Sequence, residues 1–354
     1  MKDTAVILTS GLLTSNKAKT AHGLIRGTDR FDLVGVIDDN STGKDAGIVL
    51  DGQSRDIPIF GSIDEAIQKV NRPIRYCIIG VATPGGIIPK ELQQDLMHIL
   101  DCGVSVINGL HHFLGDLPEF VQKANDKKVE LLDIRKGKPK TEQNFWSGRI
   151  YDVHCPIVAI LGTDCALGKR TTTRILVEAA EKMGVKASMV YTGQTGWLQG
   201  KGHGFIFDST VNDFVSGELE NAVVSAYHSD NPQVIYLEGQ ASLLNPSGPC
   251  GSEYLVSANA KKVILQHAPA RVFYKGWDHL DLKIPSLKKN IALIKMYDSE
   301  VIAIALNVER LSPEEIIRYK REYESELGIP AFNPIGDDVS NIVELSIQPY
   351  ISQK

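Results

Sequence analysis

The chain has 354 residues and a formal net charge of −5, and its hydrophobic content of 43% is typical of a globular protein. Its acidic balance argues against general nucleic-acid binding, and no apolar run approaches the roughly 18 residues of a membrane span, so we expect neither a nucleic-acid nor a membrane partner. Five cysteines, an odd number with no C-x-x-C pair, predict no disulfide framework and no zinc knuckle and indicate a reducing, cytoplasmic setting.

Short apolar runs alternate with amphipathic stretches in the first part of the chain. We expect helices at 17–26, 62–70 and 89–102, and strands at 4–8, 31–37, 57–60, 76–82, 104–107 and 131–134. The run at 57–60 is expected at a sheet edge, because Pro58 cannot donate to a sheet ladder. Ser62, with Glu65 three residues later, predicts a capped helix start. This strand–helix alternation predicts a parallel, Rossmann-like α/β domain over residues 1–140.

A polar and basic stretch at about 136–149 lacks apolar periodicity and is the predicted linker. A second domain, over 150–354, is expected to have strands at 156–161, 186–191, 234–237, 262–265 and 301–307. A helix is expected at 170–182 and another at 312–327, where Ser312, Pro313 and Glu315 form a strong N-terminal signal. This half is again predicted to be α/β with a mainly parallel sheet.

The sharpest signal is a buried strand that runs into a glycine-bounded loop ending in Gly-Lys, followed by a helix. Glycines let several backbone N–H groups converge on one anion, and the helix start adds its own N–H groups and positive dipole. Lys169 adds a full charge. The loop therefore predicts a phosphate-binding cofactor site made of Gly162, Thr163, Asp164, Cys165, Ala166, Gly168, Lys169, Arg170, Thr171 and Thr172.

Two details set this loop apart from the common phosphate loop. Five residues, not four, separate Gly162 from the Gly-Lys pair, and this form resembles the dethiobiotin synthetase branch of P-loop NTPases. The strand-end Glu238-Gly239 resembles the same branch. Arg170, however, stands where a Ser or Thr hydroxyl normally ligates Mg²⁺, and an Arg cannot coordinate a cation. A metal-free phosphate, such as those of coenzyme A, therefore competes with Mg²⁺-ATP as the ligand.

Further polar residues follow the other predicted strands of the second domain, at the carboxyl edge where open α/β sheets bind ligands. Candidates for substrate binding are Gln194, Thr195, Gly196, Gln240, Asp208 and Arg271, and candidates for a catalytic base are Glu238, Asp164 and His267. In the first domain, His111 and His112 are adjacent and diverge, so we predict no metal site there. The first strand lacks a G-x-G-x-x-G loop, which argues against a nicotinamide dehydrogenase.

Taken together, the chain resembles the D-glutamate N-acetyltransferases, formerly grouped as a domain of unknown function, over nearly its whole length. The residues that carry the resemblance are 19–23, 108–111, 133–135, 162–172, 192–196 and 238–240. The resemblance implies a Rossmann-like N-terminal domain, a P-loop C-terminal domain and acetyl transfer from acetyl-CoA to the amino group of D-glutamate, as a step of D-amino-acid catabolism.

Three functions remain open from the residues alone. The first is an N-acetyltransferase with a small-molecule substrate, in which backbone N–H groups near Thr195 and Gly196 stabilise the oxyanion. The second is a ligase or kinase that uses ATP with Mg²⁺, in which Thr171 takes over the metal. The third is a non-catalytic nucleotide sensor. An acidic chain of this size is also expected to form a homo-oligomer.

Overall fold

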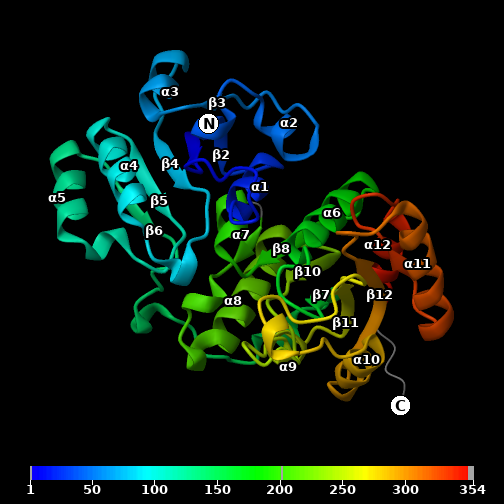
Figure 1. Cartoon of the computed structure of the whole chain (residues 1–354). Helices are drawn as coiled ribbons and strands as arrows, with labels where there is room; N and C mark the ends of the chain where they lie inside the picture. The colour runs from blue at the N-terminus through cyan, green and yellow to red at the C-terminus, as the bar shows by residue number, and fades with distance from the viewer. Residues whose placement is uncertain (1, 201, 350–354) are drawn as a thin grey trace. The chain divides into compact units, whose positions relative to one another are not determined.

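The computed structural model describes residues 2–200 and 202–349, which form two compact units (Figure 1). The N-terminal unit holds the chain up to Gly137 together with a later segment that starts at Gln194. The C-terminal unit holds Lys138–Gly193 and the chain from Gly202 onward. Among the described residues, no helix combines the length and apolar character that crossing a bilayer requires.

The N-terminal unit is built on a six-stranded parallel sheet with the order β3-β2-β1-β4-β5-β6, which is the strand order of a Rossmann domain. Every strand but β6, which is half-buried, is largely buried, as expected for a parallel sheet covered on both faces. The strands are β1 (Asp3–Leu8), β2 (Phe31–Ile37), β3 (Ile59–Phe60), β4 (Tyr76–Ile79), β5 (Ser105–Asn108) and β6 (Leu131–Asp133).

Helices of the N-terminal unit pack on this sheet through apolar faces. In α4, the buried residues Leu92, Leu96 and Ile99 recur every three or four positions, which is the spacing of one helix face. Figure 1 shows α4 and α5 side by side. The helices are α1 (Lys19–Ile25), α2 (Ala46–Asp51), α3 (Ile63–Lys69), α4 (Lys90–Asp101), α5 (Pro118–Lys127) and α7 (Gln194–Gln199).

The C-terminal unit has a seven-stranded parallel sheet with the order β13-β12-β11-β7-β10-β8-β9. The strand that leads into the phosphate loop, β7, lies in the middle of the sheet, and all of its residues are buried. The strands are β7 (Ile157–Gly162), β8 (Ala187–Tyr191), β9 (His203–Gly204), β10 (Val234–Glu238), β11 (Lys262–His267), β12 (Glu300–Leu306) and β13 (Ala331–Phe332).

Among the helices of this unit, α11 begins as its sequence predicts. The Ser312 side chain accepts a hydrogen bond from the Glu315 N–H, and the Glu315 carboxylate accepts one from the Ser312 N–H, so the capping box is complete. The helices are α6 (Lys169–Lys182), α8 (Asn212–Asp230), α9 (Ser252–Val256), α10 (Leu287–Met296), α11 (Pro313–Leu327) and α12 (Ser340–Ile347). The expected class, two α/β domains with parallel sheets, is confirmed.

The structure differs from the sequence-based expectation in the end of one strand and in several elements that were not expected, among them α7, α9, α10, α12, β9 and β13. β4 ends at Ile79 instead of continuing to residue 82, because the backbone beyond it turns to bond α1: Gly80 accepts from the Ala21 N–H, and the Ala82 N–H donates to Lys17. The helices α2, α5 and α8 were not expected.

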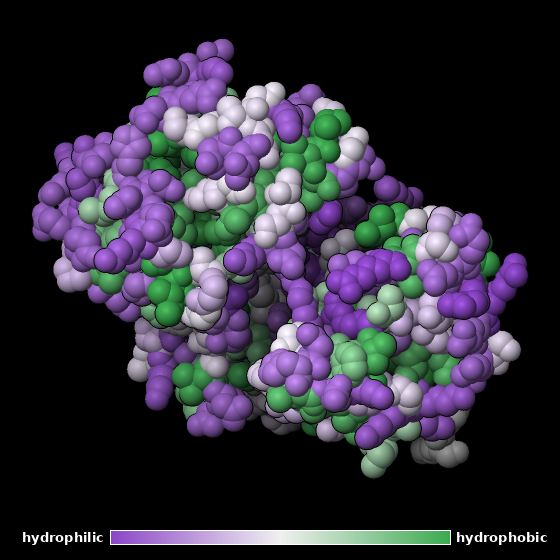
Figure 2. All heavy atoms as spheres, viewed as in Figure 1, coloured by the Kyte–Doolittle hydropathy of each residue, from purple (hydrophilic) through white to green (hydrophobic). Residues whose placement is uncertain are grey.

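On the face shown in Figure 2, hydrophobic residues form separate patches among hydrophilic ones, as on most globular surfaces.

Candidate functional site

The phosphate loop connects the end of β7 to the start of α6. Two of its residues have left-handed backbone angles, Ala166 with φ of 50° and Gly168 with φ of 103°. Gly168 precedes the first helical residue of α6, and its side-chain position is open, with no atom within 4 Å. The first N–H groups of α6 have no acceptor within the helix, so this open corner suits an anion.

Asp164 braces the loop from inside. Its carboxylate is fully buried and accepts hydrogen bonds from the N–H groups of Cys165 and Lys275, from the Asn245 side chain, and from Arg271. Two of these donors contact each carboxylate oxygen, and one of the four is a guanidinium. The geometry therefore assigns Asp164 the task of shaping the loop, and its role as a catalytic base stays a prediction.

Arg271 completes this brace. One of its Nη atoms lies 2.9 Å from the Asp164 carboxylate and 2.8 Å from the carbonyl oxygen of Cys165. The sequence suggested that Arg271 binds the substrate. Its guanidinium holds the phosphate loop in shape, and its contact with the substrate stays a prediction.

Lys169 is buried below the loop. Its Nζ donates to the carbonyl oxygens of Asp164 and Ala241, each at 2.8 Å. An ammonium group has three protons, so one is left for an anion bound in the loop. Burial lowers the pKa of Lys169 to about 8. A bound phosphate would raise this pKa again, because an adjacent anion favours the charged form.

Glu238, at the end of β10, faces the same region from the neighbouring strand. It is buried, and burial raises the pKa of its carboxyl group, while the nearby Arg170 guanidinium opposes that rise. One Arg170 nitrogen lies 4.0 Å from the carboxylate, and the Thr192 N–H donates to it at 3.3 Å. A carboxylate whose pKa is shifted toward neutrality is suited to act as a general base.

A small polar cluster surrounds Glu238. The Thr192 hydroxyl donates to the backbone oxygen of Glu238 at 2.6 Å and accepts from Gln240 at 2.9 Å and from Tyr254 at 3.2 Å. A Cβ atom added at Gly193 would lie 3.4 Å from the Gln240 amide. The sequence-predicted Gln240 is thus within the same cluster as Glu238.

His267 lies at the end of β11, where its Nδ1 is 2.9 Å from the Thr163 hydroxyl. Burial lowers the pKa of His267 to about 4, with Arg271 adding to the effect, so the imidazole is neutral at pH 7. It lines a cavity of about 340 Å³ together with Arg271, Lys283, Leu287 and Tyr323. A group with so low a pKa is a weak base near neutrality, and we favour Glu238 over His267 for that role.

The threonines after the loop bear on the nature of the ligand. The Thr172 hydroxyl donates to the Gln266 side chain at 2.6 Å, so it is directed into the sheet. Thr171 is half-buried on the first turn of α6, next to Arg170. The loop therefore offers a buried ammonium, a guanidinium and backbone amides, a donor set that suits an anion without a metal ion.

The remaining predicted residues lie in other parts of the fold. Gln194, Thr195 and Gly196 form the first turn of α7, which belongs to the N-terminal unit, where Gln194 packs against Gly109. Their grouping with the loop stays a prediction. Asp208 is exposed in the single turn η6 (Phe207–Ser209) of the C-terminal unit.

Two loop contacts were missed by sequence reasoning. Asn307, directly after β12, donates to the Leu167 carbonyl oxygen at 2.9 Å, and its place at the carboxyl end of a strand was a usable signal. Asn245 holds Asp164 from an irregular segment, and no pattern in the sequence marks it. Both residues fix the loop's shape and touch it through side-chain amides.

Comparison with protein families matches both halves of the chain. Residues 144–343 match the P-loop domain of a family described as a domain of unknown function, DUF1611. Residues 39–137 match its N-terminal, Rossmann-like domain. A crystal structure of a DUF1611 family protein from Anabaena variabilis is 26% identical, covers 98% of this chain and 100% of that one, and superposes with a TM-score of 0.87.

Two curated relatives carry a functional name. A protein of Tritonibacter scottomollicae is 30% identical over 275 residues, which are 75% of this chain and 79% of the relative, and is named D-glutamate N-acetyltransferase. A protein of a Pseudoalteromonas species is 28% identical over 273 residues, with the same coverage, and has the same name.

Proposed function

The chain belongs to the DUF1611 family of Rossmann-like and P-loop domain proteins, and from that premise we propose that it is an N-acetyltransferase that moves the acetyl group of acetyl-CoA to the amino group of D-glutamate or a similar D-amino acid. Two relatives named D-glutamate N-acetyltransferase support the reaction and the acceptor. The single structural observation that supports the donor is the metal-independent anion site formed by Lys169, Arg170 and the start of α6.

Acetyl-CoA supplies the activated acetyl group as a thioester, and its phosphates are the groups that the loop is suited to hold. In this proposal the loop amides and Lys169 bind a phosphate or pyrophosphate of CoA, and Arg170 adds a second positive charge beside it. Asp164 and Arg271 keep the loop in shape without touching the ligand. Positioning of donor and acceptor then supplies much of the rate.

Glu238 acts as the general base in this scheme. An ammonium group has no lone pair, so one proton of the D-glutamate amine must first pass to the carboxylate of Glu238. The neutral amine nitrogen attacks the thioester carbonyl carbon, and a C–N bond forms as the C–S bond breaks. The CoA thiolate leaves and takes up a proton. The products are N-acetyl-D-glutamate and free CoA thiol.

The test is release of free thiol from acetyl-CoA by the pure protein, with D-glutamate as acceptor and without any nucleotide. We expect thiol release that depends on D-glutamate and is much slower with L-glutamate. Lys169→Met keeps the side-chain volume and removes the charge, and we expect it to raise the KM for acetyl-CoA. Lys182→Met, at the other end of α6, is the matched control.

Failure would be equally clear. No thiol release over a panel of D- and L-amino acids would reject acetyl transfer, and ADP formation that requires Mg²⁺ would point to the ligase or kinase instead. An unchanged KM for acetyl-CoA in Lys169→Met would place the phosphates elsewhere, even if the enzyme transfers acetyl groups.

The proposed setting follows from the same chemistry. We place the reaction in the cytoplasm, where thiols stay reduced, because the five cysteines are all unpaired in the structure. Acetylation removes the charge of the D-glutamate amino group, which fits an early step of D-amino-acid catabolism. The homo-oligomer expected from the sequence stays a prediction.

A further inference from the structure

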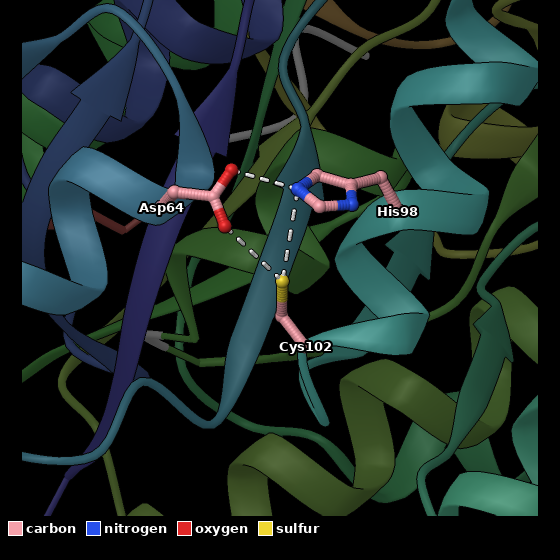
Figure 3. A group of neighbouring side chains, drawn as sticks. All are labelled: Asp64, His98 and Cys102. Carbon is pink, nitrogen blue, oxygen red and sulfur yellow. Dashed lines mark hydrogen bonds and ion pairs between the residues drawn. The ribbon is translucent and has the colours of Figure 1, made fainter.

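Three side chains with metal-ligand chemistry meet on the surface of the N-terminal unit, apart from the phosphate loop (Figure 3). Asp64 comes from α3, and His98 and Cys102 come from the end of α4. The His98 Nε2 atom is 2.7 Å from one Asp64 oxygen, and the Cys102 sulfur is 3.8 Å from the other and 3.9 Å from His98 Nε2. Among residues 2–200 and 202–349, this is the one such group of three.

These separations are close to those of a coordinated ion. With ligand bonds of about 2.0–2.3 Å, a tetrahedral zinc site holds its oxygen, nitrogen and sulfur atoms about 3.3–3.6 Å apart. In the cluster, the two Asp64 oxygens lie 2.7 Å from His98 Nε2 and 3.8 Å from the Cys102 sulfur, and the sulfur lies 3.9 Å from Nε2. The separation of Asp64 and His98 would have to open by about 0.6 Å to reach the tetrahedral spacing, a small change for two exposed side chains.

The same geometry argues against a catalytic triad of Cys, His and Asp. A triad uses the two nitrogens of the imidazole separately, one toward the nucleophile and one toward the carboxylate. Here Asp64 and Cys102 both face Nε2, so no proton relay through the ring is possible. Three ligand atoms that converge on one point are instead what a metal ion requires.

The backbone prearranges the cluster. His98 and Cys102 are four residues apart on α4, so they lie on one face of the helix. Asp64 follows Ser62, whose side chain caps α3 by accepting from the Glu65 N–H. The cluster lies at the C-terminal end of α4, where the helix dipole favours a cation. A thiolate and a carboxylate together balance the two charges of a divalent ion.

We propose that Asp64, His98 and Cys102 bind a divalent transition-metal ion of the Zn²⁺ class, with water at the fourth position. Thiolate and imidazole ligands select zinc and similar ions over Mg²⁺ and Ca²⁺. The side chains of Asp64 and His98 are 55% and 54% exposed, so the ion has a direct path from solvent. His98 also lines a cavity of about 250 Å³ whose wall includes Ser10, Asp39 and Asp95. The ion therefore lies beside a polar cavity in the N-terminal unit.

Binding would link α3 to α4 and release the thiol proton of Cys102, because only the thiolate is a strong ligand. This inference does not rest on the proposed acetyl transfer. It assigns a second site, with different chemistry, to the unit that does not carry the phosphate loop.

Titration of the metal-free full-length protein with Co²⁺ tests the proposal, because a thiolate–Co²⁺ bond has a characteristic charge-transfer absorption. We expect one Co²⁺ per chain, a thiolate band, displacement by Zn²⁺ and no displacement by Mg²⁺ or Ca²⁺. Cys102→Ser should abolish the band, and His98→Gln should weaken binding by at least about tenfold. Cys155→Ser, a partly exposed thiol in the C-terminal unit, is the matched control and should keep the band.

Two results would overturn the assignment. The first is wild-type protein without saturable Co²⁺ binding, and the second is a thiolate band that persists in Cys102→Ser. If Cys102→Ser does not fold, as judged by circular dichroism without metal, Asp64→Asn replaces it, and binding of Co²⁺ to that variant with unchanged affinity would equally contradict the site.

Discussion

Each sheet carries a loop after a central strand, and a buried aspartate holds each loop in place. The two loops differ in the groups that they offer a ligand. After β1, the Asp38 carboxylate at the end of β2 accepts from the Thr9 hydroxyl at 2.6 Å and from the Leu13 N–H at 3.0 Å. After β7, Asp164 holds the loop in the same manner, through bonds to N–H groups and to Arg271. Both aspartates are buried and both fix a loop.

The difference lies in what remains available to a ligand. The phosphate loop is followed at once by α6, with Lys169 beneath it, whereas α1 begins only at Lys19, well after its loop. The β1 loop thus presents a carboxylate and no adjoining helix start, and the β7 loop presents amides and a buried ammonium. A parallel sheet positions a ligand site, and the residues of one short loop decide whether an anion binds there.

The largest effect is expected from Glu238→Gln, which keeps the shape of the side chain and removes the base. We expect kcat to fall by about 10²–10⁴-fold with little change in the KM for acetyl-CoA, because general-base catalysis contributes factors of that size. Steady-state kinetics over a pH range would check this. A variant that keeps more than a tenth of the wild-type kcat would show that another group takes the proton.

Asp164→Asn is expected to destabilise the C-terminal unit, because it leaves the Arg271 guanidinium, whose side chain is only 17% exposed, without its anionic partner. Breaking a buried ion pair on one side costs about 3–5 kcal/mol of unfolding free energy. Urea denaturation measures the loss. Arg271→Met combined with Asp164→Asn should recover part of it, and strictly additive losses in the double variant would contradict the brace.

Lys169 makes the stability of the free protein depend on pH. Its pKa is lowered from 10.5 to about 8 in the folded state, so between those two values the unfolded chain binds more protons. Stability therefore rises with pH over that window and loses this contribution as pH falls through 8. Compared with Lys169→Met, the wild type should gain on the order of 3 kcal/mol from pH 7 to 10.5, at about 1.4 kcal/mol per pKa unit. If the unfolding free energies of the two proteins changed with pH in the same way, the lowered pKa of Lys169 would be disproved.

The smallest effect, and the sharpest test of the contrast, is expected from Asp38→Asn. The substitution removes a charged acceptor from the bonds to Thr9 and Leu13, which should cost about 1–2 kcal/mol. The KM for acetyl-CoA should not change, because the proposed anion site is built from the β7 loop and the start of α6. A raised KM without a further loss of stability would show that both loops serve the same ligand.

Local signals predicted much of the fold. The bounds of β2 were expected at 31–37, and the short strand β3 lies at a sheet edge as Pro58 indicates. The Ser62 cap of α3 is also present, although Glu65 accepts from the Gly61 N–H and not from Ser62. In these segments, residues close in the sequence determine the structure, so pattern and propensity suffice.

Prediction failed where burial depends on distant residues. Charged side chains are almost never fully buried unless they are paired, yet Glu218 and Glu220 are both buried in α8. The stretch that resembles a linker pairs with them: Lys138 and Asn144 bond Glu218, and Ser147 bonds Glu220. These partners are more than 70 positions away. No local pattern reveals such pairing.

The candidate site also combines features that local signals predict with features that depend on residues far apart in the sequence. The position of the loop and the involvement of Lys169 and Glu238 follow from motif and strand context. The pairing of Asp164 with Arg271 joins residues 107 positions apart, and no local pattern indicates that these two candidate site residues bond each other. The spacing of His98 and Cys102 is a visible helical signal, but only the packing of α3 against α4 adds Asp64.

The short helix α7 lies between segments of the C-terminal unit in the sequence, but it packs in the N-terminal unit. Leu198 is 1% exposed within the N-terminal core, and the Gln199 side chain donates to the Gly23 carbonyl oxygen at 2.8 Å. A fragment that stops at Gly137 would therefore have a cavity where Leu198 packs in the full chain. The complementary fragment would expose the apolar side chains of α7 to solvent. Expression of separate halves is thus a poor way to study either site, and co-expression of the two pieces should rescue what neither achieves alone.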